Sequence, residues 1–231
     1  MRAILLAAGI GSRLRPLTNN IPKCLMPIKG QPLLGIWLDH LSQANIGPIL
    51  INTHYLADQV ESFIEASNYK NQVTLVNEPN LEGTAGTLIK NINFFQAEDG
   101  LLIHADNYCL ADFIAFQEAH HNRPPECLMT MMTFRTNDPS SCGIVDLNER
   151  GIVTGFYEKL TKQPGNLANG AIYIISKELF PLLIKKSHEF TDFSKDVIPT
   201  LLGKIYTYET NSVMIDIGSS VAYEKANLIS T

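Results

Sequence analysis

A glycine turn followed by two basic residues is the segment of this sequence with the clearest chemistry. The apolar run Ala3–Ala7 leads into Ala8-Gly9-Ile10-Gly11-Ser12-Arg13, and Lys23 follows in a Pro-Lys pair. An apolar run that ends in small residues is typical of a buried parallel strand. Glycines at its end allow a sharp turn, where a ligand can approach backbone N–H groups that together attract an anion. Arg13 and Lys23 add full positive charges, so the segment predicts a polyphosphate site.

Two better-known phosphate loops do not fit this turn. A dinucleotide-binding loop requires G-x-G-x-x-G, but Leu14 occupies the position of the third glycine. A P-loop requires G-x-x-x-x-G-K-[ST], and neither Gly9 nor Gly11 is followed by that pattern. A bare G-x-G is a weak signal, so the turn alone leaves a purely structural role open.

Two aspartates are candidate ligands of a metal ion. Asp106 follows the apolar run Leu101–Ala105, and Asp216 follows Val213–Ile215. Parallel sheets bind ligands at the carboxyl ends of their strands. Two carboxylates, together with phosphate oxygens and water, suit Mg²⁺, which seldom has a cage made only of protein. An aspartate after a strand can also cap a turn, so position alone leaves both roles open.

Strands and helices alternate through the first half of the sequence, as expected for a parallel sheet with crossover helices. The predicted strands are Ala3–Ala7, Ile49–Asn52, Val73–Val76 and Leu101–Ala105, and the predicted helices are Leu33–Asn45, Ala57–Ala66, Thr84–Phe95 and Leu110–His120. This arrangement places the glycine turn and Asp106 at strand ends.

The second half is richer in strands. Strands are predicted over Leu128–Phe134, Ala171–Ile175, Ile205–Tyr208 and Val213–Ile215, with a hairpin of Gly143–Leu147 and Ile152–Tyr157. Helices are predicted over Lys177–Lys186 and Phe193–Leu202, and Ser219 is expected to cap a final helix. We expect Asp112 and Asp196 to cap turns or helices. The adjacent His120 and His121 cannot point the same way on a helix, and we expect both at the surface.

Several segments, in this order, resemble the signature of the nucleotidyltransferases that activate sugar 1-phosphates. That signature is usually written G-x-G-[ST]-R-L followed by P-K, and it matches Gly9–Leu14 and Pro22-Lys23. Many members that act on sugars carry a second glycine where this chain has Ala8. Further matches are Glu78–Gly86 to E-x-x-x-x-G-T-A-G, Asp106-Asn107 to G-D-N, Glu158-Lys159 to E-K, Asn169–Tyr173 to N-[AGST]-G-[IV]-Y with an allowance of one residue, and Asp216–Gly218 to D-[IV]-G.

This resemblance implies an α/β fold with a Rossmann-like, mixed and mostly parallel sheet flanked by helices, and with a small β-rich acceptor lobe. It implies Mg²⁺-dependent transfer of a nucleotidyl group from a nucleoside triphosphate to a sugar 1-phosphate, giving a nucleotide-sugar and pyrophosphate. The pattern is closest to the short mannose- or heptose-1-phosphate guanylyltransferase-like branch, without room for the C-terminal β-helix of longer relatives. We expect one domain over residues 1–231, with 1–125 mainly binding the nucleotide and 126–231 mainly binding the sugar phosphate.

The resemblance also implies a role for each matched residue. Arg13, Lys23 and Asp106 would be catalytic, and Asp106 and Asp216 would hold the metal. The nucleotide would be bound by Ala7, Ala8, Gly9, Gly11, Ser12, Glu78, Gly83 and Thr84, and the sugar phosphate by Asn107, Glu158, Lys159, Asn169 and Gly170. A carboxylate at Glu78 would accept hydrogen bonds from both N1–H and the 2-amino group of guanine, which favours GTP over UTP or dTTP. The helix opened by Thr84 would offer unpaired N–H groups.

Two alternatives remain open at this point. A phosphocholine cytidylyltransferase or an amino-sugar-phosphate uridylyltransferase shares the Ala-Ala-Gly and Pro-Lys segments, although Gly83–Gly86 and Asn169-Gly170 favour a sugar. The other alternative is a non-catalytic regulator that binds a nucleotide-sugar. The presence of Arg13, Lys23 and both metal-site aspartates argues against such a regulator.

Composition limits the partners and the compartment. With 231 residues, 45% of them hydrophobic and 18% charged, the chain is typical of a globular domain with a sizeable core. Its net charge of −5 argues against nucleic acid or an anionic membrane as a partner. No signal peptide or membrane span is expected. The four cysteines form no C-x-x-C pair, so we expect reduced, mostly buried thiols and a cytoplasmic location, and a homo-oligomer remains open.

Overall fold

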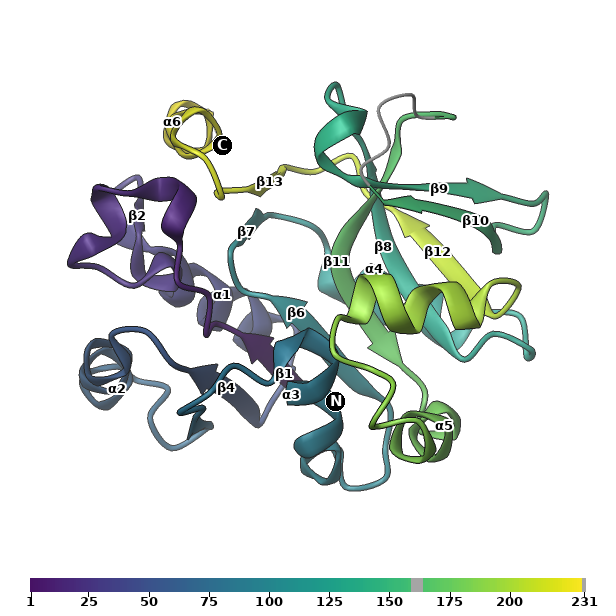
Figure 1. The fold of residues 1–231 in the computed structure, drawn as a ribbon, viewed down its shortest axis with the longest axis horizontal. Helices are drawn as coiled ribbons and strands as arrows, with labels where there is room; N and C mark the ends of the chain where they lie inside the picture. Colours follow the sequence, from purple (N-terminus) through teal and green to yellow (C-terminus); the bar gives the residue numbers. More distant parts are fainter. Residues whose placement is uncertain (159–163, 230–231) are drawn as a thin grey trace. The chain divides into compact units, whose positions relative to one another are not determined.

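The computed structural model describes residues 1–158 and 164–229, and its chain divides into two compact units (Figure 1). The first unit comprises Met1–Leu81, Ile103–Leu110 and Val213–Thr231, and the second comprises Glu82–Leu102 and Ala111–Ser212. The chain therefore passes between the units several times instead of once near residue 125. Which unit binds which substrate stays a prediction.

The first unit is built on parallel strands that the sequence marks by continuous apolar runs. β1 (Arg2–Leu6) pairs with β4 (Ile49–Thr53), which pairs in turn with β5 (Val73–Asn77), and both pairings are parallel. All of β4 is buried, as expected for a strand covered on both faces. β6 (Gly100–His104) lies on the other side of β1, and its last two residues belong to this unit.

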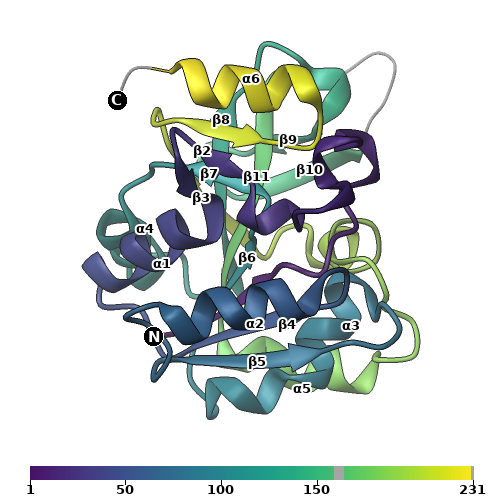
Figure 2. The same ribbon diagram turned by 90° about the vertical axis from the view of Figure 1, so that its left-hand side faces the viewer.

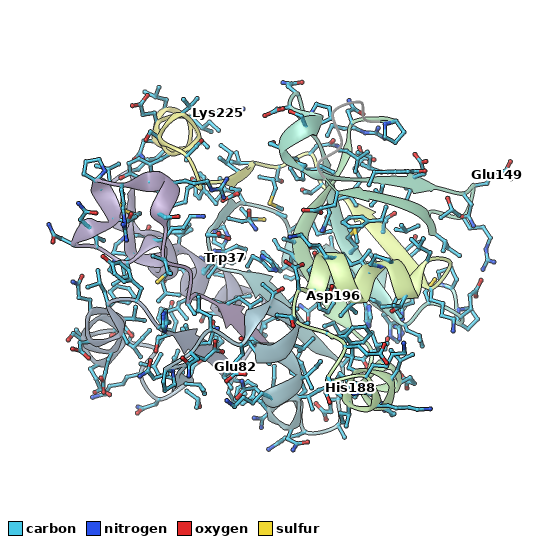
Figure 3. The ribbon with its side chains drawn as sticks, in the orientation of Figure 1. Trp37, Glu82, Glu149, His188, Asp196 and Lys225 are labelled. Carbon is cyan, nitrogen blue, oxygen red and sulfur yellow. The ribbon has the colours of Figure 1, made fainter. Side chains whose placement is uncertain are left out.

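Amphipathic helices cover these strands. α1 (Leu33–Gln43) buries one stripe of apolar side chains, among them Trp37, which lies in the interior (Figure 3). α2 (Ala57–Ala66) runs across β4 and β5 and packs against β5 through a stripe that includes Val60 and Ile64 (Figure 2). The final helix α6 (Ser220–Leu228) packs against β13, and the Ser219 hydroxyl accepts a hydrogen bond from the N–H of Ala222. The predicted cap of the last helix is therefore confirmed.

Short elements of the first unit surround the strand ends. They are the strands β2 (Pro27–Ile28), β3 (Gln31–Pro32), β7 (Asn107–Cys109) and β13 (Met214–Asp216), and the single 3₁₀ turns Ser12–Leu14, Leu17–Asn19 and Lys23–Leu25. β13 pairs antiparallel with β7, which sets Asp216 opposite Asn107. β2, β3 and β7 are absent from the elements predicted from the sequence, because each is too short to show a period.

The second unit is a mixed sheet with helices. Its strands are β8 (Met129–Arg135), β9 (Gly143–Leu147), β10 (Val153–Glu158), β11 (Leu167–Ile175), β12 (Ile205–Glu209) and the start of β6. β9 and β10 form the predicted hairpin, with Glu149 pointing outward at its tip (Figure 3). β12 runs parallel to β8, while β11 runs antiparallel to both β8 and β9.

The helical segments of the second unit are short, and a side chain caps the start of α4. They are α3 (Gly83–Lys90), the turn Ile92–Phe95, α4 (Phe113–His121), the turn Lys177–Leu179, α5 (Phe180–Lys185), a π-helical segment Phe193–Val197 and a 3₁₀ segment Ile198–Leu201. The helix predicted over 84–95 is interrupted at Asn91. The helix predicted from Leu110 begins instead at Phe113, because Asp112 accepts hydrogen bonds from two backbone N–H groups of its first turn. Asp196 likewise accepts from the N–H groups of Thr191 and Asp192, so both aspartates have the expected capping or turn role.

The predicted fold class is confirmed: the fold is α/β and Rossmann-like, with a mixed, mostly parallel sheet flanked by helices. The cysteines also agree with expectation, since all four are free thiols and only Cys142 is partly exposed. Within the part of the chain that the structure describes, no helix is both long and apolar enough to cross a bilayer.

The prediction that His120 lies at the surface is wrong, whereas His121 is exposed as expected. His120 Nδ1 lies 2.8 Å from the Thr130 hydroxyl, and Nε2 lies 3.1 Å from Asp99 Oδ2. Phe113, Phe116 and His120 share one face of α4, which packs on β8. That spacing was visible in the sequence and would have placed His120 in the core.

This buried histidine predicts a pH dependence of stability. Burial lowers the pKa of His120, so its neutral ring donates from Nε2 to Asp99 and accepts from Thr130. The unfolded chain takes up a proton near pH 6.5, but the folded chain resists it, so stability is lost as pH falls below about 6.5. The hydrogen bond from His120 lowers the pKa of Asp99, so the contribution of Asp99 to stability is lost only at still lower pH. The charges of Arg123 and Glu178 also lie near His120.

We expect His120→Gln to flatten the fall in the free energy of unfolding between pH 7.5 and 5. One proton can contribute at most about 1.4 kcal/mol per pH unit to that slope. Urea denaturation at several pH values measures it, with the exposed His188→Gln as a matched control that keeps the wild-type slope. Equal slopes for wild type and His120→Gln would contradict the assignment.

Candidate active site

The glycine turn after β1 is held in one shape by its own neighbours. Gly11 has φ +66°, and a Cβ atom there would lie 3.0 Å from Thr18 Cγ2 and 3.2 Å from Lys23 Cβ. The buried Thr18 hydroxyl donates to the Gly11 carbonyl at 2.7 Å, and the Leu14 N–H donates to the same oxygen at 2.9 Å. Glycine at position 11 is therefore required both by its conformation and by the space around it.

A buried amide connects the start of this turn to Glu78. The Asn52 side chain accepts from the Ala7 N–H at 2.7 Å and donates to Glu78 Oε1 at 3.0 Å. The Glu78 N–H donates to the Thr53 carbonyl at 2.8 Å, and both Asn52 and Glu78 are almost fully buried. Asn52 was not among the predicted site residues, although its position at the end of a predicted strand was a usable signal.

Lys23 lies between the two candidate metal-binding carboxylates. Its Nζ is 2.6 Å from Asp106 Oδ2 and 3.0 Å from Asp216 Oδ1. The lysine is 6% exposed, whereas the side chains of Asp106 and Asp216 are 37% and 52% exposed. A surface role for Lys23 is thereby excluded, and the two aspartates predicted from widely separated segments do converge.

Arg13 borders the same cluster but is open to solvent. Its guanidinium lies 3.8 Å from Asp216 Oδ2, and its side chain is 72% exposed. A Cβ atom at Gly218 would lie 2.7 Å from the guanidinium and 3.0 Å from both Asp216 oxygens. The absence of a side chain at Gly218 thus leaves the room in which the arginine and the carboxylate meet.

The charges of this cluster shift the pKa values of its members. Burial alone would lower the pKa of Lys23, but the charges of Asp106 and Asp216 outweigh burial and raise it. Desolvation would raise the pKa of Asp106, but the Lys23 ammonium holds it below its ordinary value. At neutral pH the cluster therefore contains an ammonium ion and ionised carboxylate in direct contact.

These residues fit a divalent cation bound together with a phosphate ligand. Two partly exposed carboxylates already converge on one positive group at hydrogen-bond distance. Among the described residues there is no group of three or more His, Cys, Asp or Glu side chains that could hold a metal ion. A two-carboxylate site completed by phosphate oxygens and water is the arrangement that Mg²⁺ favours.

In the second unit, Gly83 and Thr84 begin α3 in contact with the segment before Phe193. Gly83 has φ +77°, and a Cβ atom there would overlap the Thr191 carbonyl oxygen and lie 2.7 Å from Thr191 Cγ2. The Thr84 hydroxyl accepts from the Phe193 N–H at 2.7 Å, and the Ala85 N–H donates to the Thr191 carbonyl at 2.9 Å. The expectation that this helix start offers only unpaired N–H groups is therefore wrong for Ala85.

Asn169 and Gly170 lie within β11 at an irregularity of the strand. The register against β8 shifts between Asn169 and Tyr173, and Ala171 has φ +53°. Asn169 accepts from the Ala171 N–H at 2.9 Å and donates to the Tyr173 hydroxyl at 2.7 Å. Ala171 thus adopts a left-handed conformation that favours glycine, at the position where N-[AGST]-G-[IV]-Y has its glycine, and the match of this segment to the pattern stays a prediction.

The other predicted sugar-phosphate residues are distributed between the two units. Asn107, in the first unit, is buried and donates from its amide to the His104 carbonyl at 3.3 Å. Glu158, in the second unit, ends β10 opposite Gly143. Lys159 lies outside the described residues. The structure thus brings together the turn, Lys23 and both aspartates within the first unit, while Gly83, Thr84, Glu158, Asn169 and Gly170 belong to the second.

Comparison with known proteins identifies the family. The sequence pattern of the nucleotidyl transferase family matches residues 2–231. The chain belongs to this family. Its members generally use a divalent metal, in agreement with the paired carboxylates described above.

Relatives within the family include guanylyltransferases. The chain is 30% identical over 223 residues to the mannose-1-phosphate guanylyltransferase catalytic subunit beta of Drosophila melanogaster, covering 94% of this chain and 59% of the relative. It is 26% identical over 221 residues to the D-glycero-alpha-D-manno-heptose 1-phosphate guanylyltransferase of Campylobacter jejuni, covering 94% of this chain and 95% of that enzyme. The chain therefore spans about three-fifths of the mannose relative's length but nearly all of the heptose relative's.

A solved relative has the same fold. The crystal structure of HddC from Yersinia pseudotuberculosis complexed with GMP-PN superimposes with a TM-score of 0.82 at 26% identity, covering 98% of this chain and 97% of that protein. A glucose-1-phosphate thymidylyltransferase structure from Bacillus anthracis, described with a sucrose, has a TM-score of 0.83 at 21% identity and supports the fold alone. The α/β assignment and the family assignment therefore agree.

Proposed function

We propose that this protein transfers a guanylyl group from GTP to a sugar 1-phosphate, releasing pyrophosphate. The observation that carries the proposal is the convergence of Lys23, Asp106 and Asp216 beside the constrained turn at Gly11. Nucleotidyl transfer requires a phosphate-binding site and a pair of carboxylates that binds a cation. The names of the mannose and heptose relatives support the choice of substrate class.

In the proposed reaction, an anionic oxygen of the sugar 1-phosphate attacks the α-phosphorus of GTP in line with the leaving group. A new oxygen–phosphorus bond forms, and the bond to the β-phosphate oxygen breaks, so pyrophosphate leaves with the electron pair. No proton needs to be removed from an anionic phosphate oxygen. The protein therefore contributes orientation and charge neutralisation, without a covalent intermediate.

Different residues of the first unit would contribute to orientation and to charge neutralisation. The backbone N–H groups from Ala8 to Ser12 would surround the triphosphate, and Arg13 would contact the departing pyrophosphate through its forked guanidinium. Lys23 would contact the α-phosphate. Mg²⁺, held by Asp106 and Asp216, would neutralise phosphate charge. Glu78 would accept from the guanine N1–H and 2-amino groups, with Asn52 fixing one carboxylate oxygen. Because Glu78 is almost fully buried in the free protein, the base would have to uncover the carboxylate to reach it.

The sugar phosphate would be bound by Asn107, Glu158, Lys159, Asn169 and Gly170. The turn formed by Asn169 and Ala171 supports this proposal, because irregular strand segments often orient side chains and backbone toward a ligand. The net charge of −5 argues against nucleic acid and anionic membranes as partners. Free thiols favour the cytoplasm as the compartment.

Pyrophosphate release tests the proposal. The full chain is incubated with Mg²⁺, each of GTP, UTP, CTP, dTTP and ATP, and a panel that includes mannose, heptose, glucose and N-acetylglucosamine 1-phosphates and phosphocholine. We expect release with GTP and a manno-configured sugar 1-phosphate. Release only with CTP and phosphocholine, or only with UTP and an amino-sugar phosphate, would replace the proposal. No release with any pair would favour a non-catalytic regulator.

A further inference from the structure

We propose that Lys23 occupies the cation site in the free protein and that a divalent cation binds there only by displacing it. This inference rests on the proposed cation site at Asp106 and Asp216. It adds that Lys23 has two successive partners, first these carboxylates and then a phosphate of the bound nucleotide. Lys23 would thereby couple the binding of the metal to the binding of the triphosphate.

Lys23 lies at the position that a cation bridging Asp106 and Asp216 would take. The Lys23 ammonium contacts Asp106 Oδ2 at 2.6 Å and Asp216 Oδ1 at 3.0 Å, so it lies where the two carboxylates converge. A cation that binds both carboxylates through these two oxygens would have to take the position of the ammonium. The ammonium and the metal therefore compete for one position.

Electrostatic repulsion also opposes the presence of the Lys23 ammonium and a metal ion at the same point. Two carboxylates this close to one point repel each other, and the Lys23 charge offsets that repulsion in the free protein. A divalent cation at the same point would place two positive groups within a few ångströms of each other. The resulting repulsion is not screened by solvent on the lysine side, because Lys23 is almost fully buried.

A displaced Lys23 needs another anion as its partner. A buried ammonium without a counterion is costly, so Lys23 leaves the carboxylates readily only when another anion replaces them. Lys23 Cβ lies next to Gly11, in the turn proposed to surround the phosphates. A triphosphate bound there supplies that anion. Metal binding is therefore expected to be weak without nucleotide and strong with it.

Binding of Mn²⁺, measured by electron paramagnetic resonance of the free ion, tests this inference without an activity assay. Lys23→Met should raise the affinity for Mn²⁺ without nucleotide by on the order of tenfold, a typical size for coupling between two sites. GTP should tighten Mn²⁺ binding in the wild type and do so much less in Lys23→Met. Lys70→Met is the matched control, because it removes an equal charge from an exposed position of the same unit that takes no part in the site. We expect it to change the Mn²⁺ affinity much less.

Lys23→Gln serves as a second variant, since it keeps a hydrogen-bond donor while removing the charge. Thermal melts with and without Mn²⁺ establish that both variants are folded.

The displacement would be overturned if folded Lys23→Met and Lys23→Gln bound Mn²⁺ no more tightly than the wild type. GTP-dependent Mn²⁺ binding in the wild type would still leave the proposed function intact. If Mn²⁺ binds neither the wild type with GTP nor the variants, the cation site itself is wrong, and both proposals fail.

Discussion

Replacing Asp106 by asparagine is expected to lower the rate of pyrophosphate release on the order of a thousandfold, the upper range for removing one group that stabilises developing charge. Asparagine keeps the shape of the side chain and can still accept from Lys23, but it supplies no negative charge to a cation. Asp216→Asn should have a similar effect, because both carboxylates contact the same ammonium group. Initial rates at saturating GTP and sugar 1-phosphate measure the loss.

The exposure of these carboxylates makes the result interpretable. Both side chains are more than a third exposed, so neither substitution should unfold the protein. Asp58→Asn, on the exposed face of α2, is the matched control and should retain wild-type rates. Normal Mg²⁺-dependent turnover in a folded Asp106→Asn or Asp216→Asn variant would remove that residue from the proposed metal site.

Gly83→Ala is expected to destabilise the protein by about 3 kcal/mol, combining the cost of a left-handed alanine with that of overpacking. At position 83 φ is +77°, and the new methyl group would overlap the Thr191 carbonyl. That carbonyl accepts from the Ala85 N–H, so a shift of the loop would also strain the first turn of α3. Such a loss corresponds to a fall in Tm of roughly 10 °C for a chain of this size.

Gly165→Ala is the matched control for this experiment. A Cβ atom at Gly165 would meet nothing within 4 Å, and its φ is not in the left-handed region. Its Tm should therefore match or slightly exceed that of the wild type, because alanine restricts the unfolded chain. If the Tm of Gly83→Ala also matched the wild type, the close contact with Thr191 would be disproved.

Local patterns in the sequence were sufficient to predict many of the helices and strands of the fold. The apolar stripe with Val60 and Ile64 predicted α2 with its observed bounds, Ala57–Ala66, and the turn after Leu147 predicted the β9–β10 hairpin. These elements are determined by residues close together in the sequence. The candidate site was predictable to the same extent where its segments lie at strand ends, as the glycine turn, Asp106, Glu158 and Asp216 do, whereas Asn169–Tyr173 lies within β11.

Contacts between distant segments could not be predicted in this way. β7 and β13 are only three residues each, and their pairing depends on tertiary structure, not on periodicity. The burial of Lys23 likewise depends on two aspartates from other parts of the chain. A lysine after a proline in a loop is usually solvated, so only the folded structure reveals its two partners.

Through the base-binding role proposed for Glu78, Asn52 would make the choice of base depend on the polarity of a backbone amide. The Ala7 N–H can only donate, so it turns the Asn52 oxygen toward itself and the Asn52 NH₂ group toward residue 78. Residue 78 must therefore present an acceptor on that side. A glutamine introduced at Glu78 would be forced to turn its oxygen to Asn52 and its NH₂ group away from it. A substitution of Glu78 by glutamine could therefore change the base preference in one way only. It would replace the acceptor that faces away from Asn52 by a donor, because Asn52 fixes the orientation of the glutamine amide.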